Sequence, residues 1–178
     1  PSSISAISKG CFSGCINLKV VELPETLKLI GEYAFSGCQN LTDITIPASL
    51  ESLLGHAFDG CASLTCVDIP ELVTNIDAFA FNNCKSLETV NIEGQIKRVN
   101  NNLFSGCEHL KSITLPQSVT YIGSEAFKGC TAMEPAELPE VLTEINVNAF
   151  EDCQSLREIQ LNVVTAISSE AFKGCSRI

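Results

Sequence analysis

The sequence predicts an α/β repeat solenoid, a right-handed column of about eight stacked coils with 23 residues each. A phenylalanine recurs every 23 residues, with one step of 22 at the end, and a cysteine follows each of them three residues later. Aliphatic residues repeat with the same period. A fixed period of this length is typical of an array in which each unit contacts only its neighbours. The phenylalanines are Phe12, Phe35, Phe58, Phe81, Phe104, Phe127, Phe150 and Phe172.

The interior of each coil is predicted from positions counted relative to the phenylalanine. In the second repeat Leu27, Ile30 and Leu41 stand eight before, five before and six after Phe35, and the other repeats carry aliphatic residues or methionine there. Alanine precedes the phenylalanine in most repeats, as Ala34 does. We expect these side chains and the cysteines to fill the core.

A short strand is predicted in each repeat from a recurring spacing of leucine and isoleucine. The segment 41–46 reads L-x-x-L-x-L, and Ile44 alternates with Ile46 as in a strand with one buried face. Equivalent strands should stack into a parallel sheet. Pro47 should end the strand, since proline has no N–H for the ladder.

A helical or 3₁₀ turn is predicted on the other side of the coil, over residues 32–35. Gly37 follows it, and glycine adopts a positive φ at low cost. Asn83 and Asp152 take the place of this glycine in two repeats, and both residue types tolerate that conformation. Two departures, the segment 133–136 with a proline and the shortened repeat around Asn162, should weaken the sheet locally.

Composition and charge exclude several classes of protein. The formal net charge is −10, without the basic stripe expected for nucleic acid or anionic lipid surfaces. No apolar run approaches the roughly 18 residues of a membrane span. His56 and His109 lie at different repeat positions with no metal-ligand spacing near them. We therefore predict no catalysis, no metal and no cofactor, and no membrane insertion.

The ten cysteines favour free thiols over disulfides, although a few scattered disulfides stay possible from sequence. Equivalent cysteines on stacked coils point in parallel, which is poor geometry for an S–S bond. Cys66 should face solvent on the strand side, whereas Cys11 should be in the core. Only Cys66 and the terminal Cys175 are expected to react quickly in the folded protein.

Two surfaces are candidate binding sites. The outward positions of the strand side form an acidic and hydroxyl-rich face, with Lys19, Lys111 and Arg157 interspersed. Its candidate residues are Glu22, Asp43, Thr45, Asp68, Glu88, Asn91, Thr114, Glu137 and Glu158. Asp43, Asp68 and Glu88 are expected to form one patch on adjacent coils. A secondary patch on the convex side consists of Tyr33, His56 and Phe79, for which local packing is the alternative explanation.

Units such as residues 30–47, IGEYAFSGCQNLTDITIP, carry a resemblance to the BspA-like (Treponema pallidum-type) leucine-rich repeat family. The resemblance covers essentially every repeat. It implies a leucine-rich-repeat solenoid and a cell-surface or secreted role in adhesion. Residues 1–178 read as a single array, and we expect this array to be a fragment of a longer one without either cap.

The sequence thus predicts a non-catalytic module of a surface or secreted adhesin. The expected partner is a protein or an extracellular-matrix or glycan surface, bound through the strand face. The alternative is an intracellular repeat scaffold that mediates protein–protein interaction beside a separate effector domain.

Overall fold

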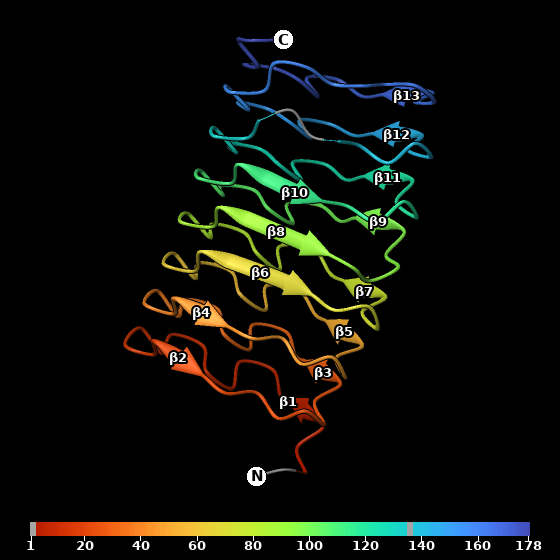
Figure 1. The fold of residues 1–178 in the computed structure, drawn as a ribbon. Coiled ribbons are helices and arrows are strands. Elements are labelled where there is room, and N and C mark those ends of the chain that lie inside the picture. Colours follow the sequence, from red (N-terminus) through yellow and green to blue (C-terminus); the bar gives the residue numbers. More distant parts are fainter. Residues whose placement is uncertain (1–2, 135–136) are drawn as a thin grey trace.

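The computed structural model describes residues 3–134 and 137–178, which wind into a column of stacked coils (Figure 1). The two ends of the chain lie at opposite ends of the column, and the colours advance coil by coil between them (Figure 1). We number the coils 1 to 8 by the phenylalanine that each contains, from Phe12 to Phe172. The predicted stacked-repeat architecture is confirmed.

One side of the column is formed by the strands that the sequence predicts, and we call it the wide sheet. Two hydrogen-bonded groups make it up, β2–β4 and β6–β8–β10, and all pairs are parallel. The bounds are β2 (Val20–Val21), β4 (Asp43–Ile44), β6 (Cys66–Ile69), β8 (Thr89–Ile92) and β10 (Ser112–Thr114). Asp68, Asn91 and Thr114 lie in register across the last three strands.

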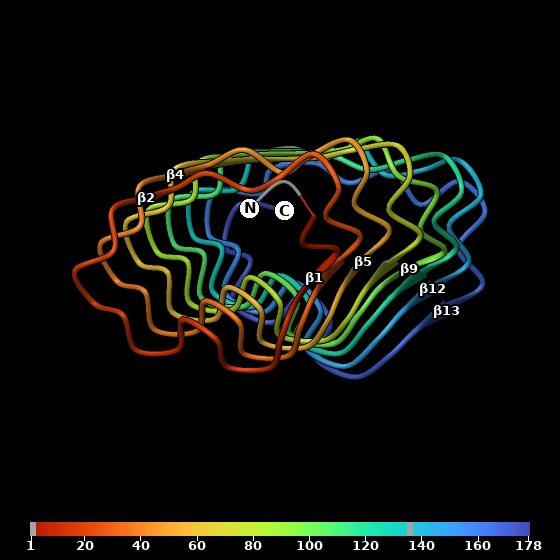
Figure 2. The same cartoon turned by 90° about the horizontal axis from the view of Figure 1, so that it is seen from below.

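A second set of parallel strands, which the sequence analysis missed, forms another side that we call the narrow sheet. Its strands have two residues each and lie five and six positions before the phenylalanine. They are β1 (Ala6–Ile7), β3 (Leu29–Ile30), β5 (Ser52–Leu53), β7 (Asn75–Ile76), β9 (Arg98–Val99), β11 (Tyr121–Ile122), β12 (Glu144–Ile145) and β13 (Ala166–Ile167). The view along the column shows β1, β5, β9, β12 and β13 on a different side from β2 and β4 (Figure 2).

The third side, which we call the turn side, corrects the prediction of helical or 3₁₀ turns. Within the described residues there is no helix, and the segments equivalent to 32–37 are consecutive turns. Tyr33 has a φ of 57° and Gly37 a φ of 72°, whereas a helix requires negative φ at every residue. The Ala34 N–H donates to Gly31 O at 3.1 Å, while the Phe35 N–H donates to Ala57 O of the next coil at 2.7 Å. The fold is therefore a β-solenoid rather than an α/β structure.

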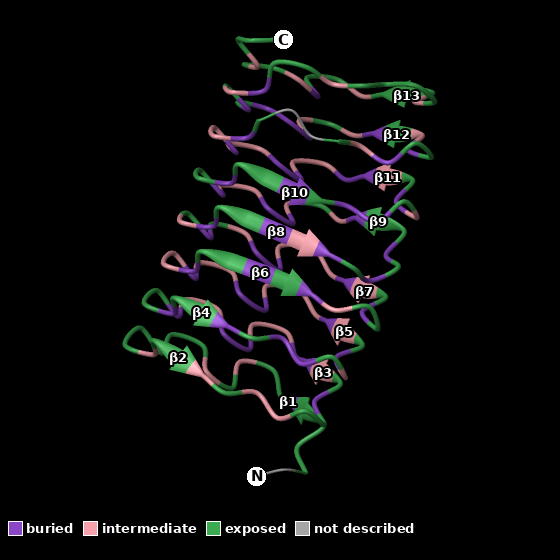
Figure 3. Ribbon diagram, in the orientation of Figure 1, coloured by how far each residue is buried: buried purple, intermediate pink, exposed green. Residues whose placement is uncertain are grey.

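The core is a column of phenylalanine rings. Neighbouring rings stack with centroids 5.1–5.7 Å apart and planes within 14° of parallel. The six rings from Phe35 to Phe150 are fully buried. Burial colours show that buried residues alternate with more exposed ones along β6, β8 and β10 (Figure 3).

The cysteine column connects adjacent coils. The thiol of Cys107 donates to the Phe81 carbonyl of the preceding coil at 3.2 Å, and the cysteines of coils 2 to 8 all make the same contact at 3.0–3.2 Å. The phenylalanine carbonyl also accepts the N–H of the cysteine in its own coil. These buried thiols therefore act as donors as well as small apolar side chains.

Both sheets are interrupted. Between β7 and β9 the narrow sheet breaks, and the side-chain amide of Asn100 donates to Ile76 O at 2.7 Å. In the wide sheet no strand follows β10 in the part of the chain that the structure describes. Coil 7, which includes the shortened repeat around Asn162, has no wide-sheet strand, as expected. Of the segment 133–136, residues 135 and 136 lie outside the described residues.

Candidate binding surfaces

The face of the wide sheet presents its most regular part at β6, β8 and β10. Inward-pointing Val67, Val90 and Ile113 are buried, because they alternate with the outward residues and pack on the core. Each strand contributes two outward residues, and these lie in register with the outward residues of the neighbouring strands. The pairs are Cys66 with Asp68, Thr89 with Asn91, and Ser112 with Thr114.

The predicted face residues occupy three parallel columns of this surface. Six share the position ten residues after the phenylalanine, namely Glu22, Thr45, Asp68, Asn91, Thr114 and Glu137. Asp43 and Glu158 lie two positions earlier in the repeat, and Glu88 lies three earlier. All are exposed except Asn91, which is half-buried and donates to Glu93 Oε1 at 3.4 Å.

The expected single patch of Asp43, Asp68 and Glu88 therefore needs revision. They lie on adjacent coils but at three different repeat positions, so they are not aligned along the column. Glu88 is also held by Lys111, with Nζ 2.7 Å from Oε2. Hydrogen bonding to that ammonium group lowers the pKa of Glu88. Asp43 and Asp68 remain the better tests of this face, since neither forms an ion pair within the described residues.

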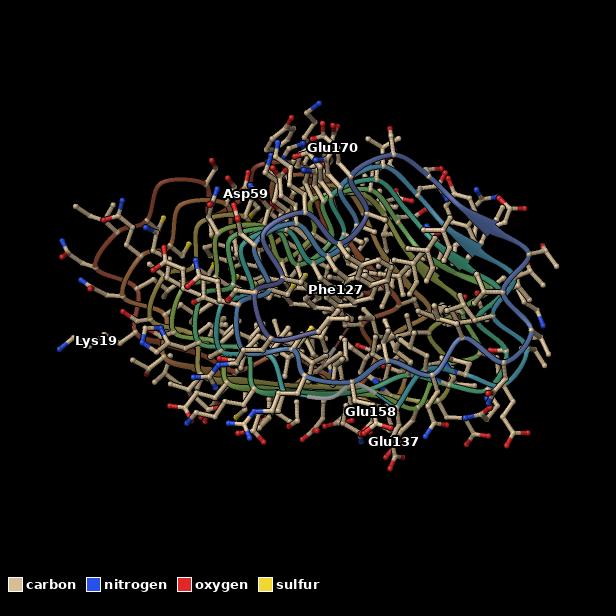
Figure 4. All side chains as sticks on the ribbon, turned by 90° about the horizontal axis from the view of Figure 1, so that it is seen from above. Lys19, Asp59, Phe127, Glu137, Glu158 and Glu170 are labelled. Carbon is tan, nitrogen blue, oxygen red and sulfur yellow. The ribbon has the colours of Figure 1, made fainter. Side chains whose placement is uncertain are left out.

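Tyr33, His56 and Phe79 form a continuous stack, which we call the aromatic column. The ring centroids of Tyr33 and His56 are 4.5 Å apart, those of His56 and Phe79 are 4.6 Å apart, and the planes lie within 11° of parallel. Each ring face between these residues is covered by the neighbouring ring. The local-packing explanation therefore accounts for much of the recurrence of aromatic residues at this repeat position. Glu170 has the same repeat position as these three residues. It lies on the side of the column opposite Glu137 and Glu158, so this repeat position lies across the coil from the wide sheet (Figure 4).

A groove runs beside the aromatic column, between the turn side and the narrow sheet, and it has a volume of about 700 Å³. The residues that matter for its chemistry are Glu32, Gly55, Asp77, Ala78, Arg98 and Asn101. Tyr121 also borders it, with the Arg98 guanidinium carbon 3.7 Å from its ring centroid. One wall of the groove, the aromatic column, was predicted from the sequence, and the other lining residues were not. The sequence feature that could have predicted the groove is the pair of small residues Gly55 and Ala78, which share a repeat position where other coils carry larger side chains.

All ten cysteines are free thiols in the structure, as predicted. Cys66 is exposed on β6, also as predicted. The prediction that Cys11 lies in the core is wrong, because Cys11 is exposed in the structure, as is Cys15 of the same coil. Burial raises the pKa of the Cys84 and Cys107 thiols well above the usual value, so they stay protonated and unreactive.

Each histidine has a hydrogen-bond partner for its Nδ1 atom on a neighbouring residue. His56 Nδ1 lies 2.9 Å from Asp59 Oδ2, and His109 Nδ1 lies 2.8 Å from the Lys85 carbonyl. Across residues 3–134 and 137–178, no group of three histidine, cysteine or acidic side chains could hold a metal ion. No helix in that part of the chain could cross a membrane.

Stacked coils with short parallel strands, a phenylalanine column and a repeat of 23 residues define a leucine-rich-repeat solenoid. A family model described as the BspA type leucine rich repeat region matches residues 1–111 and 97–178 in six copies. The chain belongs to the BspA-type leucine-rich repeat family. No sequence among curated proteins matches the chain.

Three solved bacterial structures show the same fold. A leucine-rich repeat protein of Treponema pallidum is 30% identical with a TM-score of 0.66, and the match covers all of this chain and 75% of that protein. One from Eubacterium ventriosum is 28% identical with a TM-score of 0.79, and the match covers 99% of this chain but only 45% of that protein. One from Bacteroides ovatus is 25% identical with a TM-score of 0.51, and the match covers all of this chain and 70% of that protein.

Proposed function

We propose that the chain is a non-catalytic module that binds a protein partner through the face of the wide sheet. The observation that carries this proposal is the aligned set of outward polar side chains on β6, β8 and β10, held in register by the strand pairing. A repeat array offers an extended, rigid surface of this kind to partners. The side chains need no large rearrangement to bind, which limits the entropy cost of association.

The chemistry of this face favours a partner with basic and hydrogen-bonding groups. Asp43, Asp68 and Glu158 are exposed on it, and hydroxyl groups of Thr89 and Thr114 lie between the charges. An acidic face attracts a basic partner over a distance limited by salt, about 8 Å at physiological ionic strength. Complex formation should therefore weaken as ionic strength rises.

We further propose that the whole protein is a surface or secreted adhesin-like molecule and that its partner belongs to the extracellular matrix or a host cell. The support is the family resemblance. The rival proposal, an intracellular scaffold beside an effector domain, fits the reduced thiols equally well. The flanking sequence of the full reading frame distinguishes the two, since an anchor and an export signal belong only to the first.

The test compares two triple variants with the same change in net charge. Glu22→Lys, Asp43→Lys and Asp68→Lys lie on three adjacent coils of the face. Glu71→Lys, Glu140→Lys and Glu144→Lys are exposed at other repeat positions and serve as the control. In capture experiments from matrix and host-cell extracts at moderate salt, the first variant should lose partners that the control retains. Equal capture by both variants would place the binding surface elsewhere.

A further inference from the structure

The groove beside the aromatic column exists because two coils carry small residues at one repeat position. Three residues before the phenylalanine, coils 3 and 4 have Gly55 and Ala78, where coils 2, 5 and 7 have Glu32, Asn101 and Val147. The resulting hollow of about 700 Å³ lies within the range of about 300–1,000 Å³ for small-molecule sites. It lies next to the point where the narrow sheet breaks between β7 and β9.

The floor of the groove offers main-chain hydrogen-bond donors. The N–H groups of Gly55, Ala78 and Asn101 donate to no acceptor within residues 3–134 and 137–178. One coil further, the equivalent N–H of Ser124 is bound by Asn101 Oδ1 at 3.0 Å. This contact shows that an oxygen outside the main-chain ladder can accept from the N–H group three residues before the phenylalanine. Gly55 and Ala78 have no side chain that could do the same for their neighbours.

Arg98 adds a positive charge to the same groove. Its guanidinium group stacks on Tyr121, and no carboxylate pairs with it among the described residues. Stacking on a ring holds the planar group in place and leaves its N–H donors free at the edge. A guanidinium group in this state matches the two oxygens of a carboxylate.

Two carboxylates border the groove as well. Glu32 Oε2 accepts from Lys9 Nζ at 2.6 Å, and Asp77 Oδ1 accepts from Asn75 Nδ2 at 2.9 Å. Each keeps a second oxygen as an acceptor. These negative charges disfavour a simple anion, whereas they favour a ligand that carries hydroxyl donors beside its own carboxylate.

We propose that this groove binds an acidic sugar of the hexuronate class. The sugar carboxylate pairs with Arg98 and the uncapped amides of Ala78 and Asn101, and the ring hydroxyls donate to Asp77 and Glu32. The stacked rings of the aromatic column keep the adjoining wall rigid. This is a second site, on another side of the column from the face of the wide sheet, and it does not depend on a protein partner there.

The experiment titrates the chain with galacturonate and follows the main-chain N–H resonances by NMR. The Ala78 and Asn101 amides should shift in a saturable manner as they gain an acceptor. Arg98→Gln should weaken binding at least tenfold, while Arg177→Gln, which removes an exposed charge elsewhere, should leave it unchanged.

A second pair of variants tests the shape of the groove at one position. Ala78→Glu fills the hollow and repels a carboxylate, and Ala78→Ser keeps it open. Both residue types occur at this repeat position, as Glu32 and Ser124, so both variants should fold. We expect binding to be lost in the first and kept in the second.

Several results would overturn the proposal. The absence of a saturable shift with galacturonate at tens of millimolar would exclude the site. If glucose bound as tightly as galacturonate, Arg98 would not recognise a carboxylate. If acetate bound as tightly as galacturonate, the groove would not recognise the sugar hydroxyls. Unchanged binding in Ala78→Glu would place the ligand outside the groove.

Discussion

Glu151 shows how charged side chains are arranged along the turn side. It is only 7% exposed and lies between two cations, with Lys128 Nζ at 2.8 Å and Lys173 Nζ at 3.1 Å. Lys128 and Lys173 belong to the coils before and after it, at the same repeat position. Hydrogen bonds from both ammonium groups lower the pKa of Glu151 to about 2. The carboxylate therefore connects three successive coils only while it is charged.

The pH dependence of stability should report this arrangement. The pKa of Glu151 is lower in the folded than in the unfolded chain, so its contribution is present above the unfolded value of about 4.3 and is lost as the pH falls toward about 2. Glu151→Gln should lower the melting temperature at pH 7, and the difference from the wild type should shrink below pH 4. The matched control Glu158→Gln, an exposed carboxylate without an ion pair in the described residues, should change little at either pH.

A difference in melting temperature that stays constant from pH 7 to pH 3 would contradict this account. In that case the loss in Glu151→Gln would come from packing or hydrogen bonding rather than from charge. Circular dichroism melts of the three proteins at both pH values make the comparison.

Some residue-scale features follow from the sequence and others do not. The buried phenylalanines and thiols were predictable, because a fixed period in the sequence places each type at the same position of every coil. The positive φ of Tyr33, His56 and Phe79 was not, since bulky residues rarely adopt that conformation. The hydrogen bonds to the next coil outweigh this local preference, and the same conformation rules out the predicted helical turn.

Single coils are the elements of this protein, and their stability should depend on their neighbours. The Phe81 ring stacks on Phe58 at 5.4 Å and on Phe104 at 5.7 Å, whereas Phe172 stacks only on Phe150 within the described chain. Phe81→Ala should cost roughly 3–5 kcal/mol of unfolding free energy, because it leaves a cavity between two packed coils. Phe172→Ala should cost clearly less, since Phe172 is partly exposed.

Chemical denaturation of both variants measures these losses. Similar losses at the two positions would contradict the picture of a linear array in which each coil is stabilised by the coils on either side. Phe104→Ala, another interior position, should behave like Phe81→Ala and serves as the positive control.

The strand elements were predicted only in part. The wide sheet was visible in sequence, because isoleucine alternation over several residues marks a strand with one buried face. The narrow sheet was not, since strands of two residues leave no alternation to detect. Backbone pairing between coils, rather than local pattern, creates strands such as β5 and β7.

At the scale of the whole molecule, the solenoid separates two surfaces with different chemistry. The wide sheet exposes an acidic and hydroxyl-rich face, and the groove combines Arg98 with uncapped amides on another side. The residues of the first were predictable from the repeat. The groove was not, because it depends on which side chains are missing from particular coils and on how the break between β7 and β9 places Arg98.

The most direct test of the proposed binding face uses a thiol that the chain already carries. Cys66 is exposed on β6 beside Asp68, whereas Cys11 and Cys15 are exposed on coil 1 away from the centre of the face. The three thiols can be alkylated in one sample, with and without the captured partner, and their rates followed by mass spectrometry. We predict that the partner slows alkylation of Cys66 at least fivefold and leaves Cys11 and Cys15 unchanged. An unchanged rate at Cys66 in the saturated complex would contradict binding through the wide sheet.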